Sequence, residues 1–216
     1  MYDHKWNSYS KQSGKFGGTI PVLCQPALKR QHGATVVNAN LIVGERVAAG
    51  TPMEFDLATR TAKLMKLWKI KNVEVSGDNT VVTLHKTAVT PVLHHNTVVM
   101  VMPSSLTGTG KAAVCGNVTE GEDVYTITLA TASFDTLKAG AFLVEAKEAG
   151  SGKAPICVPN HITTEDVVKG SENTLVDVMR GHIYMYQNTI PAMPEVVKAA
   201  MFNNDIQVSW EMYNEE

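Results

Sequence analysis

The stretch NVEVSGDNTVVTL, residues 72–84, decides the fold class of this chain. Polar and apolar residues alternate over Asn72–Val75, which is the period of a β-strand with one buried face. Ser76-Gly77-Asp78-Asn79 is typical of a hairpin turn, because Gly, Asp and Asn accept the backbone angles of such turns. Thr80–Leu84 is the expected return strand. The stretch therefore predicts a β-hairpin.

Similar short strands are expected on the C-terminal side of this hairpin. Thr97–Met102 is a short apolar run that ends before a proline, and Val124–Leu129 alternates with Tyr125, Ile127 and Leu129 on one face. Ala141–Ala146 follows a turn at Lys138-Ala139-Gly140. Strands at intervals of roughly 8–15 residues, without helices between them, predict a small β-barrel or sandwich.

The last third of the chain has a different sequence pattern, which combines a predicted helical turn with predicted strands. Over His161–Val168, the sequence Thr163-Thr164-Glu165-Asp166 resembles a capping box and predicts a short helical turn. Asn173–Gln187 predicts two strands joined by a turn at Arg180-Gly181. Asp205–Met212 predicts a final strand, in which Ile206, Val208 and Trp210 alternate.

One true helix is expected near the C-terminal end. Pro194 suits a first helical turn, and Met193, Val197, Ala200 and Met201 share one face at helical spacing. Asn203-Asn204 is expected to end it.

Two predicted domain boundaries, called joints below, divide the chain into a discontinuous domain and an inserted domain. The Gly-rich stretch Ser151–Pro155 is one joint, and Lys69-Ile70-Lys71 is the other. Residues 71–152 would form an inserted small β-barrel or sandwich domain, and residues 19–70 plus 153–216 would pair as one β-rich domain. The predicted fold is therefore mainly β: a small β-barrel with an inserted all-β domain and one short C-terminal helix.

Residues 1–18 form an expected extended N-terminal arm. They are rich in Ser, Gly and Lys without a periodic apolar pattern, so this segment cannot offset its ordering entropy by burial within its own fold. They also contain Tyr2, Trp6, Tyr9 and Phe16. One interpretation is a frayed terminus. The other is an arm that orders on a partner, with these four aromatic residues as its anchors.

Composition excludes several classes of protein. Hydrophobic residues make up 44% and charged residues 19%, which is typical of a globular chain. A net charge of −2 and a pI near 6.4 argue against a nucleic-acid-binding basic face. No apolar run approaches the ~20 residues of a membrane span, and the N-terminus lacks the apolar core of a signal peptide. Cys24, Cys115 and Cys157 predict free thiols in a reducing compartment rather than a disulfide framework.

Each catalytic pattern in the sequence fails on spacing or context. Thr107–Lys111 lacks the first Gly and the final Ser or Thr of a phosphate-binding loop. His94 and His95, near His85, are adjacent and have no Cys or carboxylate at ligand spacing, so we expect exposed loop histidines rather than metal ligands. Cys115 and Cys157 are expected to be small buried hydrophobes. We therefore expect no catalytic, cofactor-binding or metal-binding residues and no cofactor.

Two parts of the chain carry a resemblance to a known family. Glu45–Asp56, with the sequence ERVAAGTPMEFD, and the following Thr61–Leu64 resemble a motif of head-decoration and head-fibre proteins of tailed phages. The end of the chain resembles the β-rich end of the same family at Pro159–Val167, Val176–Tyr184 and Pro194–Ala200. These stretches together cover about half of the chain.

The resemblance implies a non-enzymatic virion protein on the capsid exterior, synthesised in the host cytoplasm. Its implied partner is the major capsid protein, contacted partly through the N-terminal arm, with no nucleic acid and no membrane involved. It also implies a homo-oligomer, with a trimer favoured over a dimer. An alternative is an adhesin-like β module on the virion that binds host glycans or surface proteins. A virion-associated hydrolase is a third class, but it requires a nucleophile–base pair that the sequence does not display.

Overall fold

The computed structural model describes residues 28–38, 41–130, 134, 137–181, 183–204 and 206–209. These residues form mainly β-strands, and α2 (Glu195–Phe202) is the single α-helix among them. The strands make a closed barrel, a larger sheet and two small two-stranded sheets. The prediction of a mainly β protein with a β-barrel and one short C-terminal helix is therefore confirmed.

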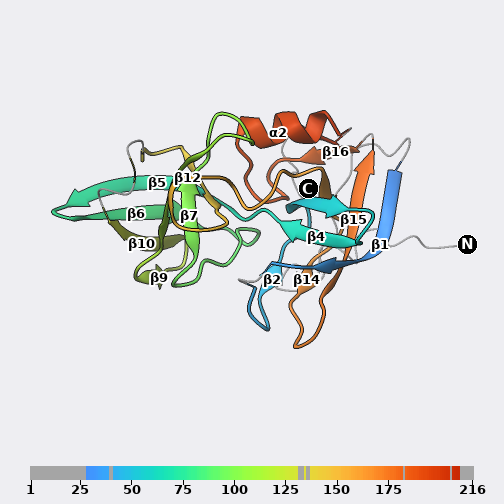
Figure 1. Cartoon of the computed structure of the whole chain (residues 1–216), viewed down its shortest axis with the longest axis horizontal. Helices are drawn as coiled ribbons and strands as arrows, with labels where there is room; N and C mark the ends of the chain where they lie inside the picture. The colour runs from blue at the N-terminus through green and yellow to red at the C-terminus, as the bar shows by residue number, and fades with distance from the viewer. Residues whose placement is uncertain are drawn as a thin grey trace, which may run out of the picture.

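The closed barrel combines strands from two distant parts of the chain. Its order is β1-β15-β13-β3-β4, with bounds β1 (Leu28–Val36), β15 (Leu175–Gly181), β13 (His161–Thr163), β3 (Pro52–Asp56) and β4 (Thr61–Leu64). Inward-facing residues of these strands, such as Met53, Ala62 and Val178, are buried in one cluster. The barrel forms the right-hand part of the molecule in Figure 1.

The larger sheet takes its strands from the chain between the two barrel segments. Its order is β12 (Gly150–Lys153), β8 (Gly110–Val114), β7 (Val98–Val101), β11 (Phe142–Glu145), β5 (Leu67–Ser76), β6 (Asn79–His85), β10 (Val124–Ala130) and β9 (Val118–Glu120). The amide of Gly116 donates to the carbonyl of Thr128 at 3.0 Å, and the amide of Thr128 donates to Asn117 at 3.2 Å. The sheet therefore curls back so that the end of β8 meets β10.

The predicted hairpin and its neighbours are confirmed. β5 and β6 pair in the expected register, with Ser76 opposite Asn79, and Gly77 has the positive φ of +60° that favours glycine. Along β10, Tyr125, Ile127 and Leu129 are buried on one face. The runs 97–102 and 141–146 form β7 and β11. These inward-facing side chains pack with Trp68 and Leu143 into the core of the curled sheet.

The chain passes from barrel strands to sheet strands between β4 and β5. The chain leaves β4 at Leu64 and enters β5 at Leu67, so the expected joint at Lys69–Lys71 falls inside a continuous strand. The sheet strands extend to Lys153. The division into a discontinuous domain and an inserted domain remains a prediction.

Two small sheets complete the fold. β2 (Arg46–Val47) pairs with β14 (Val167–Val168), and β16 (Ile183–Tyr186) pairs in parallel with β17 (Ile206–Ser209). Helix α2 connects the second pair and lies along the upper side of the molecule in Figure 1.

The helix prediction is confirmed at both ends. Pro194 is the N-cap and Asn203 the C-cap, and Val197 and Met201 are buried on the predicted face. Asp205 and residues 210–212 of the expected last strand lie outside the described residues.

Two predictions in the last third are wrong. His161–Val168 is not a helical turn, because β13 and β14 pair there with β3 and β2. Thr163 Oγ1 donates to the carbonyl of Ala48, so the residue expected to cap a helix bonds across the barrel instead. Arg180-Gly181 is not the turn of a hairpin, since Gly181 ends β15, and β15 and β16 belong to different sheets.

Candidate functional site

The sequence-predicted anchors Tyr2, Trp6, Tyr9 and Phe16 lie outside the described residues, as does the whole arm 1–18. Their role as a capsid anchor remains a prediction. Within the part of the chain that the structure describes, the best candidate for a binding site is a groove beside helix α2.

This groove has a volume of about 840 Å³ and runs between the larger sheet and the segment that leads into α2. The sheet side contributes Lys69 of β5, Phe142 of β11 and the residues that follow β7. The opposite wall is the segment from Gln187 to Val196. The lining is mostly apolar and consists of Lys69, Met102, Pro103, Ser104, Gly140, Ala141, Phe142, Gln187, Asn188, Ile190, Pro191, Ala192, Met193, Pro194, Glu195, Val196 and Lys198.

Backbone packing fixes the outer wall of the groove. Thr189 Oγ1 donates to the carbonyl of Tyr186 at 2.9 Å, which closes the turn after β16. Ile190 is buried against Gly50, and a Cβ added at Gly50 would lie 2.4 Å from Ile190 Cγ2. Gly50 therefore allows the wall to approach the barrel closely.

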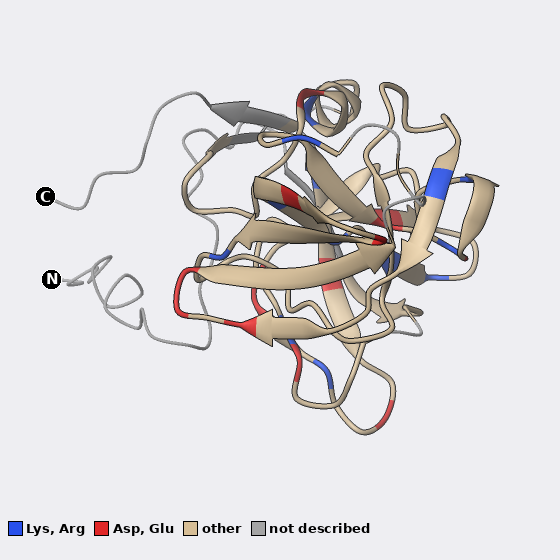
Figure 2. Cartoon of the chain, turned by 90° about the vertical axis from the view of Figure 1, so that its left-hand side faces the viewer, with Lys and Arg blue, Asp and Glu red and all other residues tan. Residues whose placement is uncertain are grey.

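The sheet side of the groove carries positive charge. Lys69 and Lys71 are exposed on β5, and a smaller hollow of about 200 Å³ continues the groove past Lys69 to His85. The pKa of His85 is lowered from its usual value, first by partial burial and then by the charges of Lys69 and Lys71. At the opposite wall, Lys198 Nζ lies 2.9 Å from Glu195 Oε1. Elsewhere, Lys and Arg are scattered among Asp and Glu along the ribbon (Figure 2).

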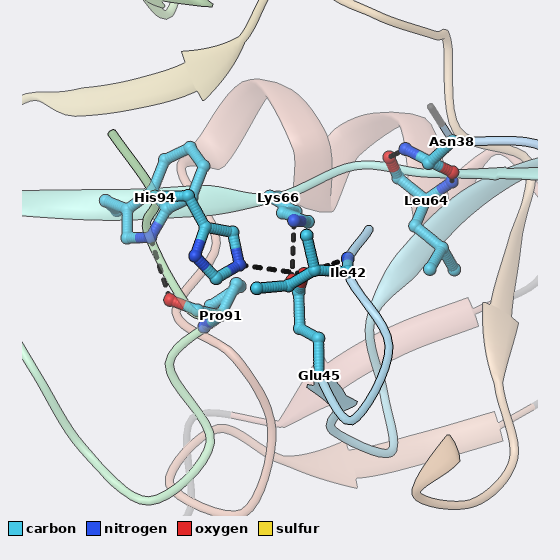
Figure 3. A network of polar contacts seen from close by, with 8 residues as sticks. Asn38, Ile42, Glu45, Leu64, Lys66, Pro91 and His94 are labelled. Carbon is cyan, nitrogen blue, oxygen red and sulfur yellow. Dashed lines mark hydrogen bonds and ion pairs between the residues drawn. The ribbon is translucent and has the colours of Figure 1, made fainter. Parts of the chain in front are cut away.

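A buried polar cluster lies where the barrel meets the sheet (Figure 3). Glu45 Oε1 accepts from Lys66 Nζ at 2.6 Å, and its Oε2 lies 2.9 Å from His94 Nε2. The amide of Ile42 also donates to Oε2, at 3.2 Å. The Glu45 and Lys66 side chains are almost fully buried, whereas His94 is a quarter exposed. The cluster satisfies one buried carboxylate with three donors, which is the requirement for burying such a charge.

Further hydrogen bonds surround this cluster. Arg46 bonds Asp166 at 2.9 Å through Nε, and its Nη1 donates to the carbonyl of Ala88 at 2.6 Å. Trp68 Nε1 donates to the carbonyl of Pro91 at 2.9 Å, which fixes the loop that carries His94. Because Glu45 bonds Lys66 and His94, and Arg46 bonds Ala88, across the boundary between barrel and sheet, we interpret the cluster as a structural junction between the two.

Sequence reasoning did not identify this junction. His94 was expected to be an exposed loop histidine, which is wrong, while His95 is exposed as expected. Glu45, Lys66 and His94 come from three separate segments, and no local pattern connects them.

The stretches that carry the family resemblance contact each other. Asp166 Oδ1 accepts from the amide of Ala49 at 2.8 Å. The amide of Thr51 donates to Thr163 Oγ1 at 3.0 Å. The Gly-Thr-Pro turn and the His161–Val167 segment therefore form one bonded unit of the barrel.

The cysteines in the described residues are free and buried, as expected. Burial raises the pKa of the Cys115 and Cys157 thiols to about 12. Since the thiolate is the reactive species, neither side chain is suited to nucleophilic catalysis. Cys24 lies outside the described residues.

The structure also bears on the possible phosphate-binding loop, on metal sites and on membrane-spanning helices. Lys111 of the Thr107–Lys111 stretch lies in strand β8, whereas a phosphate-binding loop leads into a helix. Among the described residues, no group of three or more His, Cys, Asp and Glu side chains is arranged to hold a metal ion. No helix in the described part of the chain is both long and apolar enough to span a membrane.

Comparison of the chain with protein-family models, with curated proteins and with solved structures found no match.

Proposed function

We propose that this chain is a non-enzymatic structural protein of a tailed-phage virion, which decorates the capsid head or forms fibres on it. The observation that carries the proposal is the bonding of Ala49 and Thr51 to Asp166 and Thr163. The two distant stretches that resemble the decoration and head-fibre family thus belong to one structural unit, as parts of a single family module would.

The proposal assigns the N-terminal arm to the major capsid protein. Tyr2, Trp6, Tyr9 and Phe16 would fill pockets on the shell, and the arm backbone would add to an exposed strand edge. Attachment as a homo-oligomer, with a trimer favoured and a dimer as the alternative, would make weak single contacts sufficient. The site of action would be the virion exterior.

The first test is the copy number of this chain relative to the major shell protein in purified particles, by quantitative mass spectrometry. A ratio within a few-fold of one supports decoration of every shell unit or symmetry axis. A few copies per particle would indicate a fibre or tail component. Complete absence from particles would overturn the proposal.

The second test addresses the arm. Deletion of residues 1–17 is expected to abolish binding to isolated shells, and Trp6→Ala/Tyr9→Ala is expected to weaken it by ~10-fold or more, as aromatic anchors do. The matched control is Lys5→Ala/Lys11→Ala, which keeps the aromatic residues. Unchanged binding after the deletion would refute the anchoring role.

An adhesin-like role is a second candidate, favoured by the groove beside α2. Its lining includes the aromatic ring of Phe142 and the amides of Gln187 and Asn188, which are groups that sugar sites use. Tyr125 cannot contribute a stacking surface, because it is buried in the sheet core. A glycan array without binding at high protein concentration would remove this candidate.

A further inference from the structure

The pairing of β16 with β17 brings the end of β17 to the rim of the groove. The two strands run parallel, and Ser209 pairs with Tyr186. The residues directly after Tyr186, Gln187 and Asn188, line the groove. The end of β17 at Ser209 therefore lies next to the start of the groove wall.

The groove offers both apolar surface and unneutralised positive charge. Phe142, Met102 and Val196 are partly buried and pack against the core beneath the groove. Lys69 lines the groove, and Lys71 lies two residues farther along β5 outside the lining; among the described residues neither forms a salt bridge with a carboxylate, and both are exposed. Such a surface suits an extended peptide that carries apolar side chains together with carboxylates.

The sequence that follows Ser209 has this composition. Residues 210–216 read WEMYNEE, with Trp210, Met212 and Tyr213 as large apolar residues and Glu211, Glu215 and Glu216 as acids. This segment contains no Lys or Arg, and it lies outside the described residues. Fully extended, it reaches up to about 23 Å.

We propose that residues 210–216 dock in the groove of their own chain, with the aromatic residues against the apolar lining and the glutamates near Lys69 and Lys71. The same chain is the favoured occupant because β17, the strand before the segment, ends at Ser209 beside the groove wall, so the effective concentration of the segment at the groove is high. This inference is independent of the proposed virion role. An external ligand of the groove would have to displace the segment.

Hydrogen–deuterium exchange of the intact chain and of a chain ending at Ser209 tests this proposal. The backbone amides of Gln187–Met193 are expected to exchange about tenfold faster in the shortened chain, because docking protects the wall. The amides of β10 serve as an internal reference for folding. Equal exchange of Gln187–Met193 in both chains would overturn the proposal.

Charge variants test how the segment is held. Lys69→Glu/Lys71→Glu is expected to give exchange as fast as truncation does, as is Glu211→Gln/Glu215→Gln/Glu216→Gln. The matched control is Lys147→Glu, which alters an exposed lysine outside the groove lining. If Lys147→Glu had the same effect as the groove variants, the assigned contacts would be wrong.

Protein concentration distinguishes the two possible sources of the segment. Docking in the same chain predicts the same exchange rate at low and high protein concentration. Protection that appears only at high concentration would show that a second copy supplies the segment, which would overturn the proposal of docking in the same chain.

Discussion

Glu45 Oε1 lies 2.6 Å from Lys66 Nζ, and neither side chain is more than 3% exposed. Glu45 belongs to the segment before β2, whereas Lys66 lies between the last barrel strand on that side and the first strand of the sheet. An ion pair at this depth is held by its mutual charges, since each charge alone would be strongly disfavoured there. The pair therefore makes the position of the sheet dependent on the barrel.

Removing one partner of the Glu45–Lys66 ion pair is expected to destabilise the folded protein. Lys66→Met leaves the Glu45 carboxylate buried with only His94 and one amide, and the free energy of unfolding should fall by about 3–5 kcal/mol. The double variant Glu45→Met/Lys66→Met should lose less than Lys66→Met alone, because no buried charge remains. Chemical denaturation measures both.

The control for this pair is Lys153→Met, which removes the partner of the exposed Glu148. Exposed pairs contribute little, so its effect should be much smaller than that of Lys66→Met. A double variant that is less stable than Lys66→Met would contradict the interpretation of the pair.

Gly50 is expected to be intolerant of any side chain. Its φ is +79°, and an added Cβ would lie 2.4 Å from Ile190 Cγ2 and 2.8 Å from Ile190 Cβ. Gly50→Ala should cost about 1–2 kcal/mol for the backbone conformation and a further ~1–3 kcal/mol for overpacking. Thermal and chemical denaturation provide the measurement.

Gly77→Ala is the matched control for Gly50→Ala. Gly77 also has a positive φ, of +60°, but nothing lies within 4 Å of an added Cβ. It should therefore show the conformational cost alone. Equal losses at the two glycines would mean that the contact with Ile190 does not constrain the groove wall.

The comparison of these sites with the sequence shows what local patterns can predict. Residues 72–84, Val124–Leu129 and the helix after Pro194 were predicted correctly, because alternation, turn residues and helical spacing act between near neighbours. His161–Val168 was not, since its strands β13 and β14 pair with β3 and β2, which lie more than a hundred residues away in the sequence. Thr163 has the chemistry of a helix cap, but its hydroxyl bonds the barrel carbonyl of Ala48.

The candidate site could not be predicted from local sequence patterns for the same reason. The groove joins β5, β11 and the segment before α2, which approach only when the sheet and barrel have formed. Glu45, Lys66 and His94 likewise come together only in the folded chain. The sequence shows their chemistry but not their proximity.

His161 is expected to make stability depend on pH. The pKa of this histidine is lowered from 6.5 to about 4, first by burial and then by the positive charge of Arg180. The neutral ring donates from Nδ1 to Asn160 Oδ1 at 2.8 Å and contacts Phe55 edge-on. Between pH 6.5 and 4 the unfolded chain binds a proton that the folded chain does not, so stability falls as the pH decreases through this range.

The upper limit of this effect is about 3–4 kcal/mol, at 1.4 kcal/mol per pKa unit. Urea denaturation at pH 7 and at pH 4.5 measures it, and His161→Gln should reduce the difference between the two conditions. His95→Gln alters an exposed histidine and should leave that difference unchanged. A His161→Gln chain with the same pH dependence as the original would show that His161 is already protonated in the folded state at pH 4.5.

The buried thiols are expected to be unreactive in the folded protein. With a pKa of about 12, Cys115 and Cys157 are ionised at pH 8 to only about one part in 10,000, and burial further limits access. In a Cys24→Ser chain, 5,5′-dithiobis(2-nitrobenzoic acid) should therefore detect no thiol until denaturant is added, and both thiols afterwards. Cys157 also donates weakly to the carbonyl of Lys63 at 3.4 Å, which anchors it beside the barrel. A thiol that reacted in the native Cys24→Ser chain as fast as free cysteine would contradict the packing of these residues and would reopen the question of a nucleophilic role.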